Sequence, residues 1–245
     1  MIEDIKGIVL AGGLGKRLHP LTKITNKHLL PIYDRPMIYH PVSRLAQAGI
    51  RDILVVTGGQ HAGEFLRLLG DGKYFGLTHL NYTYQEGEGG IAQALGLAKH
   101  FARGKRTVVI LGDNIFEKSL KPFVDRFRRQ KSGARVLLKR VSDPERFGVA
   151  TLKRGRIASI EEKPKRPRTD LAVTGVYMYD TQVFDMIRKL KPSRRGELEI
   201  TDVNNAYLKK GELEHDVLSG WWTDSGTFDS LLRANVLVAK QHGKQ

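Results

Sequence analysis

Short apolar runs alternate along this chain with longer segments whose apolar residues recur at helical spacing. Four of the runs read as buried strands, at residues 6–11, 53–57, 80–84 and 107–111. A helix is expected between the last two, because one helical face would collect Ile91, Ala94, Leu95, Ala98 and Phe101. Another helix is predicted over residues 122–131. Strands and helices that alternate in this order favour a doubly wound sheet with helices on both faces.

The second half of the chain has shorter apolar runs. We expect strands at 135–139, 149–152, 157–161 and 172–179, a helix over 181–190 and a last helix from 227 to about 240. Two prolines within residues 163–168 predict a loop. The chain shows no internal repeat and no low-complexity linker. We therefore predict a Rossmann-like α/β fold with a mixed, mostly parallel sheet, in one domain over 1–245. Its nucleotide half would cover about 1–115 and its substrate half about 116–245.

Composition narrows the class of protein. The 245 residues include no cysteine, which excludes disulfides, thiolate metal sites and cysteine nucleophiles. The first apolar run, at residues 8–11, is far too short for a signal peptide. No stretch approaches the roughly 18 apolar residues of a membrane span. We expect a soluble cytoplasmic protein that does not act at a membrane.

The chain is strongly basic. It carries 41 Lys and Arg against 26 Asp and Glu, a formal net charge of +15, which points to an anionic partner such as nucleic acid, a membrane surface or a phosphorylated metabolite. The cations concentrate in residues 121–140 and 153–168, with few of the aromatic residues that single-strand binders interleave. Neither a helix-turn-helix nor a zinc-finger pattern is present. A solvated basic surface is favoured, and a nucleic-acid-binding protein remains an alternative from another class.

A glycine turn directly follows the first predicted strand, with the sequence Leu10-Ala11-Gly12-Gly13-Leu14-Gly15-Lys16-Arg17-Leu18. Glycines let backbone N–H groups approach a phosphate closely, and the adjoining basic side chains would neutralise it. It is not a Walker loop, since Leu10 and Arg17 stand where that motif needs Gly and Ser or Thr. Leu18 likewise breaks the dinucleotide fingerprint. Phosphate binding and an ordinary tight turn remain equally open here.

Three further segments carry candidate chemistry. Lys27 precedes an apolar run that ends in proline. Asp113 and Asn114 follow a predicted strand, at the end where open α/β sheets bind ligands, and Asp224 precedes the last helix. Either Asp could hold Mg²⁺, or could simply cap a helix. Each segment alone leaves both interpretations open.

Taken together, these segments resemble the sugar-1-phosphate nucleotidylyltransferases, and among them the enzymes that use dTTP and glucose 1-phosphate. The resemblance covers nearly the whole chain, through residues 7–16, 26–45, 90–97, 111–116, 143–149, 161–164, 172–179, 196–201 and 221–226. Lys16 departs from the Thr or Ser usual in the family. The chain resembles a short form of the family, because longer members carry more C-terminal helices at a regulatory nucleotide site.

The resemblance implies an enzyme that joins dTTP and glucose 1-phosphate into dTDP-glucose and pyrophosphate, with Mg²⁺ as cofactor and by direct in-line attack. Asp113 and Asp224 would hold the metal. The implied catalytic residues are Arg17, Lys27, Asp113, Lys163 and Asp224. The implied nucleotide-binding residues are Leu10, Ala11, Gly12, Gly13, Gly15, Arg17, Lys27, Gln85, Gly90 and Asp113.

The implied sugar-phosphate site comes from the second half of the chain. Its residues would be Asn114, Gly148, Glu162, Lys163, Val173, Gly175 and Arg195, and Trp222 would form one wall. Residues 86–89 lack the prolines often found there in the family, so a UTP-using uridylyltransferase is the alternative within the enzyme class. A catalytically silent homologue is disfavoured, because all five implied catalytic residues are present. The family also implies a homo-oligomer that supplies nucleotide sugar for polysaccharides through a dTDP-rhamnose type of pathway, with no nucleic-acid partner.

Overall fold

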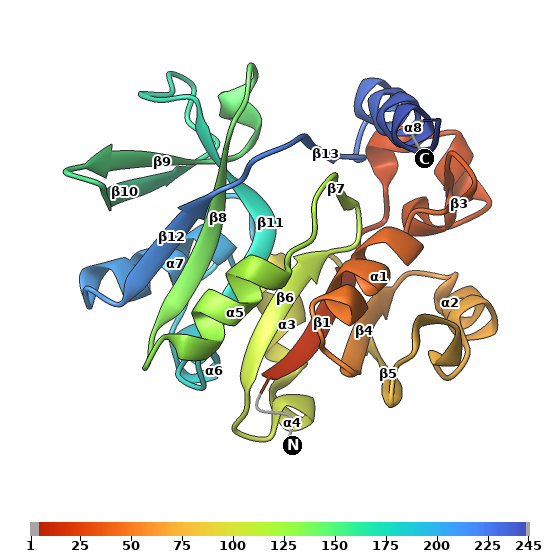
Figure 1. The fold of residues 1–245 in the computed structure, drawn as a ribbon, viewed down its shortest axis with the longest axis horizontal. Helices are drawn as coiled ribbons and strands as arrows, with labels where there is room; N and C mark the ends of the chain where they lie inside the picture. Colours follow the sequence, from red (N-terminus) through yellow and green to blue (C-terminus); the bar gives the residue numbers. More distant parts are fainter. Residues whose placement is uncertain (1–4, 244–245) are drawn as a thin grey trace.

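The computed structural model describes residues 5–243. Four parallel strands form the first half of the sheet: β1 (Ile5–Ala11), β4 (Asp52–Gly58), β5 (His79–Gln85) and β6 (Arg106–Leu111), in the order β6-β1-β4-β5 (Figure 1). β1 lies in the middle, and its Ile8 pairs with Leu54 on one side and Val109 on the other. Almost every residue of β1 is buried, as expected of a parallel strand covered on both faces.

The second half of the chain extends this sheet past β6. It contributes β8 (Ala134–Arg140), β9 (Gly148–Lys153), β10 (Arg156–Glu162), β11 (Leu171–Tyr179) and β12 (Leu213–Val217). β11 runs antiparallel to β6, β8 and β9, while β12 runs parallel to β8. Within residues 5–243 these strands make one nine-stranded mixed sheet. The predicted α/β fold with a mixed sheet is confirmed.

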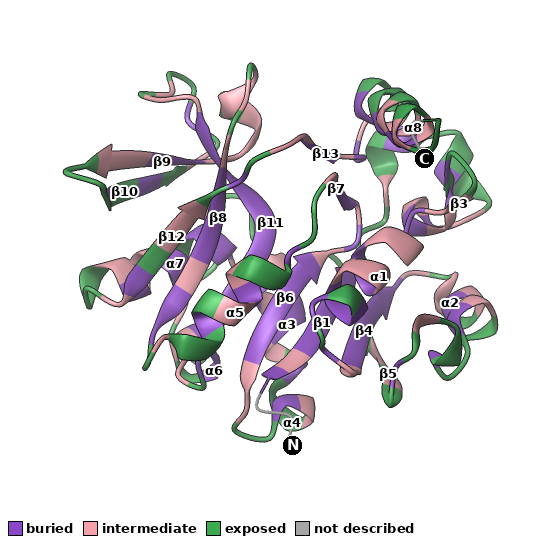
Figure 2. Cartoon of the chain, viewed as in Figure 1, coloured by how far each residue is buried: buried purple, intermediate pink, exposed green. Residues whose placement is uncertain are grey.

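Helices cover both faces of the sheet because its strands are apolar on both sides. Ile8 and Leu10 of β1 point into one core, and Val9 and Ala11 into the other. The first core packs against α3 (Ile91–Gly96), α4 (Lys99–Ala102), α6 (Val183–Arg188) and α7 (Ile200–Lys209). The second packs against α1 (Tyr39–Gln47), α2 (Ala62–Leu69) and α5 (Lys121–Arg129). Figure 2 shows the sheet buried between exposed outer helix faces.

A smaller core holds the last helix, α8 (Phe228–His242), against Ile115 and the segment that contains Ile32 and Met37. Its Ala234 and Val238 contact the core that contains Ile32 and Met37. Thr227 begins the helix with a capping box, in which its side chain and that of Ser230 each accept a backbone N–H. Two short ladders lie nearby, β2 (Pro31–Ile32) with β3 (Arg35–Pro36), and β7 (Asn114–Phe116) with β13 (Trp222–Asp224).

The β7–β13 ladder builds the functional site. It pairs Asn114 with Asp224 and so brings together two segments about a hundred residues apart in the sequence. Single 3-10 turns complete the fold: η1 (Lys16–Leu18), η2 (Leu21–Lys23), η3 (Lys27–Leu29), η4 (Lys73–Phe75) and η5 (Pro144–Arg146).

All eight strands expected from the apolar runs are present, and the loop between β10 and β11 falls where the two prolines predicted it. The helix expected over residues 91–101 is interrupted after Gly96, and a second short helix, α4, follows from Lys99. Residues 39–47, 62–69 and 200–209 form helices that were not predicted. None of the helices described between residues 5 and 243 has the length and apolar character to span a bilayer.

Candidate active site

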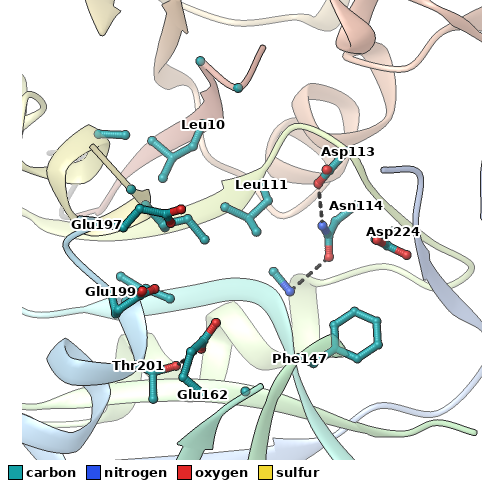
Figure 3. Close-up of a pocket in the computed structure, with 18 of the residues that line it drawn as sticks. Leu10, Leu111, Asp113, Asn114, Phe147, Glu162, Glu197, Glu199, Thr201 and Asp224 are labelled. Carbon is teal, nitrogen blue, oxygen red and sulfur yellow. Dashed lines mark hydrogen bonds between the residues drawn. The ribbon is translucent and has the colours of Figure 1, made fainter. Parts of the chain in front are cut away.

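One cavity of about 400 Å³ opens at the carboxyl ends of β1 and β6, as expected for an open α/β sheet. Figure 3 shows Asp113, Asn114 and Asp224 on one side of it and Glu162, Glu199 and Thr201 on the other. Of the residues predicted for the site, the cavity wall includes Leu10, Gly12, Gly13, Arg17, Lys27, Gln85, Gly90, Asp113, Asn114, Gly148, Glu162, Lys163, Val173, Gly175, Arg195 and Asp224.

Two predicted residues lie behind the wall. Ala11 is buried in the core on the far side of β1. Gly15 adopts a left-handed conformation at φ 68°, and a Cβ there would lie 3.0 Å from Cβ of Lys27. Gly15 thus provides the turn that lets Lys27 pack close to the glycine segment.

Lys27 and Asp113 form the most enclosed ion pair of the cavity. Nζ of Lys27 lies 2.6 Å from Oδ2 of Asp113, and both side chains are 13% exposed. Burial raises the pKa of Asp113, but the charge of Lys27 and hydrogen bonds from Lys27 and Asn114 outweigh it and hold that pKa well below its ordinary value. His28 also lines the cavity, and burial followed by the Lys27 charge lowers its pKa to about 3. Asp113 is therefore charged beside a neutral imidazole.

Asp224 is held by a second cation, which the sequence did not single out. Nη2 of Arg146 donates to both carboxylate oxygens of Asp224, at 3.0 and 2.8 Å, while its Nη1 donates to Asp143 at 2.6 Å. Burial and the neighbouring Asp113 charge raise the pKa of Asp224, and Arg146 opposes them. Arg17 also acts on this carboxylate, and its Nη2 lies 2.9 Å from where a Cβ on Gly226 would stand. The two carboxylates thus share one electrostatic environment.

Asn114 connects Asp113 to strands β11 and β13 through side-chain hydrogen bonds. Its Nδ2 donates to Oδ1 of Asp113 at 2.9 Å, and its Oδ1 accepts from N of Gly175 at 3.0 Å (Figure 3). The same Oδ1 accepts from Nε1 of Trp222 at 2.7 Å. The register of β11 shifts between Val173 and Tyr177, which frees the Gly175 amide for this bond. Gly175 is required there, because a Cβ would stand 2.6 Å from Asn114.

The opposite wall carries hydrogen-bonding groups suited to a polyol. Oγ1 of Thr201 donates to Oε2 of Glu162 at 2.5 Å. A Cβ on Gly148 would lie 3.1 Å from that hydroxyl, so glycine keeps this part of the wall open. Lys163 takes a positive φ of 43° just after β10, and its N donates to the carbonyl of Phe147 at 3.0 Å. Its side chain is 47% exposed, and its Nζ lies 3.8 Å from Oε1 of Glu162.

Arg195 reaches the cavity but is engaged by carboxylates. Its Nη2 lies 2.9 and 2.8 Å from the two oxygens of Glu199, 3.4 Å from Glu197 and 3.7 Å from Glu162. Its predicted contact with a sugar phosphate therefore stays a prediction, and would require part of this network to open.

The residues present suit a hard divalent cation. Among residues 5–243, no cluster of three or more His, Asp or Glu side chains is positioned to hold a metal. Asp113 and Asp224 nevertheless face the same cavity, and each is neutralised by a basic side chain. Two carboxylates fit a cation such as Mg²⁺, which keeps most of its shell for water and substrate phosphate.

The sequence interpretation missed Arg146, Glu199 and Thr201. Glu199 pairs with Arg195 four residues before it, but residues 195–199 are not helical, so the i,i+4 rule for helices would not have identified this pair. Arg146 pairs locally with Asp143, but its bond to Asp224 spans 78 residues and that of Thr201 to Glu162 spans 39, so neither role has a local signal.

Comparison with known proteins identifies what this chain is similar to. Residues 6–241 match the family model described as nucleotidyl transferase. A glucose-1-phosphate thymidylyltransferase from Neisseria meningitidis serogroup A is 47% identical over 238 residues, which cover 96% of this chain and 82% of the relative. The enzyme of the same description from Mycobacterium tuberculosis strain H37Rv is 44% identical over 245 residues, covering 98% and 84%.

Solved structures agree. A Bacillus anthracis protein assigned as a glucose-1-phosphate thymidylyltransferase, solved with sucrose, superposes with a TM-score of 0.92 at 57% identity, covering 95% of this chain and 94% of that one. A UDP-glucose pyrophosphorylase with UDP-glucose has a TM-score of 0.85 at 24% identity, covering 97% and 99%. The second likeness shows a shared fold.

Proposed function

The chain belongs to the nucleotidyl transferase family, and from this premise we propose that it transfers a thymidylyl group from dTTP to α-D-glucose 1-phosphate, giving dTDP-glucose and pyrophosphate. The observation that carries the proposal is one cavity that joins the glycine turn and Lys27 to Glu162 and Lys163. A nucleotide and a sugar phosphate held at these two ends would meet between them.

The reaction forms a bond from a sugar-phosphate oxygen to the α-phosphorus and breaks the bond from that phosphorus to the β-phosphate oxygen. Two anions must approach each other, so the protein has to neutralise and orient them. Lys27 would act at the α-phosphate and exchange its bond to Asp113 for one to phosphate. Arg17 would neutralise the departing pyrophosphate, and Lys163 and Arg195 would hold the sugar phosphate.

Asp113 and Asp224 would hold a divalent cation, for which we propose Mg²⁺. When bound, this ion supplies positive charge that neutralises and orients phosphate oxygens. Backbone N–H groups of the turn formed by Gly12, Gly13 and Gly15 would support the triphosphate.

The sugar hydroxyls would meet Glu162, with Gly148 and Val173 lining the hexose pocket and Asn114 behind it. At the other end, Gln85 and the backbone of Gly90 would read the pyrimidine edge. Discrimination of dTTP from UTP would depend on one methyl group, worth about 1–3 kcal/mol in an apolar pocket, and on one hydroxyl. Some use of UTP is therefore expected.

Pyrophosphate release tests the proposal. The purified chain is incubated with Mg²⁺, glucose 1-phosphate and one of dTTP, UTP, CTP, ATP or GTP, and pyrophosphate is measured. Release with dTTP well above the others is expected. Release mainly with UTP would keep the mechanism and overturn the assignment of the base pocket, and no release with any nucleotide would refute the proposal.

We also propose, from the family resemblance, that the enzyme works in the cytoplasm as a homo-oligomer. Its product would supply polysaccharide synthesis through a dTDP-rhamnose type of pathway. The basic surface would not bind nucleic acid. Light scattering tests the oligomer, and retention on DNA–cellulose at low salt would contradict the expected lack of nucleic-acid binding.

A further inference from the structure

The side-chain amide of Gln85 has both of its N–H bonds occupied by the protein. Nε2 donates to Oε1 of Gln93 at 2.8 Å and to the carbonyl oxygen of Gly90 at 3.3 Å. A backbone carbonyl can only accept, so the end of the Gln85 amide that faces Gly90 must be the NH₂ group. The orientation of this amide therefore follows from its surroundings.

The other end of the same amide remains free to accept. A Cβ placed on Gly12 would stand 2.4 Å from Oε1 of Gln85, so glycine at position 12 leaves room for this oxygen beside the cavity. Gln85 is 6% exposed and lies at the end of β5. With both hydrogens engaged elsewhere, Gln85 offers the cavity an acceptor and no donor.

Gln93 is itself held in place although it does not line the cavity. It lies on α3, which begins after Gly90 and is tied to the opposite wall, because N of Ala92 donates to the carbonyl of Leu198 at 3.1 Å. Its amide lies against Gly89, where a Cβ would stand 2.2 Å from Cδ and Oε1 of Gln93. Glycine at position 89 thus leaves the space that the Gln93 amide occupies.

We propose that Gln93 is a positioning residue for base selection, which acts by holding the Gln85 amide with its oxygen toward the nucleobase. An imide N–H, as in thymine or uracil, can donate to that oxygen. Cytosine carries a lone pair on the same ring nitrogen and meets lone pair against lone pair. Without the acceptor on Gln93, only the longer bond to the Gly90 carbonyl, at 3.3 Å, opposes a 180° turn of the amide that would offer its NH₂ group to cytosine. This inference rests on the proposed function, in which Gln85 reads the pyrimidine.

The test compares dTTP with dCTP in four variants. Gln93→Met deletes the acceptor at similar volume, and Gly89→Ala displaces the Gln93 amide without removing it. Gln93→Glu keeps a carboxyl oxygen that can accept from Nε2 of Gln85. Gln47→Met is the matched control, since exposed Gln47 on α1 accepts from Arg44 at 2.8 Å, far from the cavity. Both kcat/KM and the equilibrium affinity for each nucleotide, by calorimetry, are measured.

Gln93→Met and Gly89→Ala should each lower the ratio of dTTP to dCTP by about tenfold, through KM and affinity rather than kcat, which matches the loss of one hydrogen bond. Gln93→Glu should restore most of the ratio, and Gln47→Met should leave it unchanged. An unchanged ratio in Gln93→Met, or a Gln93→Glu variant as unselective as Gln93→Met, would overturn the inference. Calorimetry keeps the two proposals apart, because a wild-type chain that prefers dTTP but does not turn it over refutes only the proposed reaction.

Discussion

Replacing Lys27 by methionine should destabilise the protein as well as inactivate it. Lys27 and Asp113 are 2.6 Å apart and only 13% exposed. Removing one member of such a pair leaves a charge with little access to water and typically costs about 3–5 kcal/mol. Asn114 still donates to Asp113 in the variant, so we expect the lower end, about 3 kcal/mol. In a chain of this size that corresponds to a melting temperature lower by roughly 6–12 °C.

A double-mutant cycle separates stability from catalysis. Asp113→Asn removes the charge that Lys27→Met leaves unpaired, so the double variant should recover most of the lost free energy of unfolding, measured by urea titration. Its pyrophosphate release should stay at least about two decades below wild type, because the group proposed at the α-phosphate is still missing.

The pH dependence of stability provides an independent check of the Lys27–Asp113 pair. The pKa of Asp113 is depressed in the folded protein, so the pair stabilises fully above the ordinary carboxyl pKa near 3.8 and this contribution is lost as pH falls through the depressed value. The gap in stability between wild type and Lys27→Met should therefore narrow as the pH is lowered toward 3. A Lys27→Met variant within about 1 kcal/mol of wild type at pH 7, the range of an exposed pair, would refute the reasoning.

Four other changes test the site. His28 is neutral in the folded protein because burial and then Lys27 lower its pKa from 6.5 to about 3, so stability should fall as pH drops below 6.5. His28→Gln should reduce that fall between pH 7.5 and 5 in urea midpoints, and His40, whose pKa burial lowers to about 4, should account for part of what remains. Arg17→Ala should lose about two to three decades of kcat, and near-normal turnover would remove Arg17 from the mechanism. Asp224→Asn should abolish Mg²⁺-dependent pyrophosphate release, whereas activity that survives would place the metal elsewhere. Gly175→Ala should cost about 1–3 kcal/mol by forcing Asn114 aside, and a melting curve that matches wild type would contradict that contact.

Most of the sheet could be predicted from the sequence because buried parallel strands are continuous apolar runs. Ile8, Val9 and Leu10 belong to such a run, and both of its faces are covered. The helix over residues 39–47 was not predicted because Pro41 interrupts its apolar pattern, although proline is tolerated in the first helical turn. The helix over residues 200–209 was not predicted because part of its buried face is polar, including Thr201 and Asn204.

The site residues also divide into those that local sequence marks and those that it does not. Asp113 and the glycine turn follow strands directly, so local sequence marked them as candidates. Arg146 and Gln93 act through partners on other elements, and single-sequence patterns do not contain those pairings. Without the family resemblance, each predicted motif would have stayed as compatible with a helix cap or a tight turn as with catalysis.

Two main-chain hydrogen bonds join residues 89–92 to Leu198, and they have a consequence for evolution and engineering. N of Leu198 donates to the carbonyl of Gly89 at 2.9 Å, and N of Ala92 donates to the carbonyl of Leu198 at 3.1 Å. These bonds join the segment that carries Arg195 and Glu199 to the loop proposed to lie beside the nucleobase. Substitutions that widen the proposed sugar pocket through this segment should also shift the proposed base pocket, so sugar range and nucleotide range should change together across a mutant library.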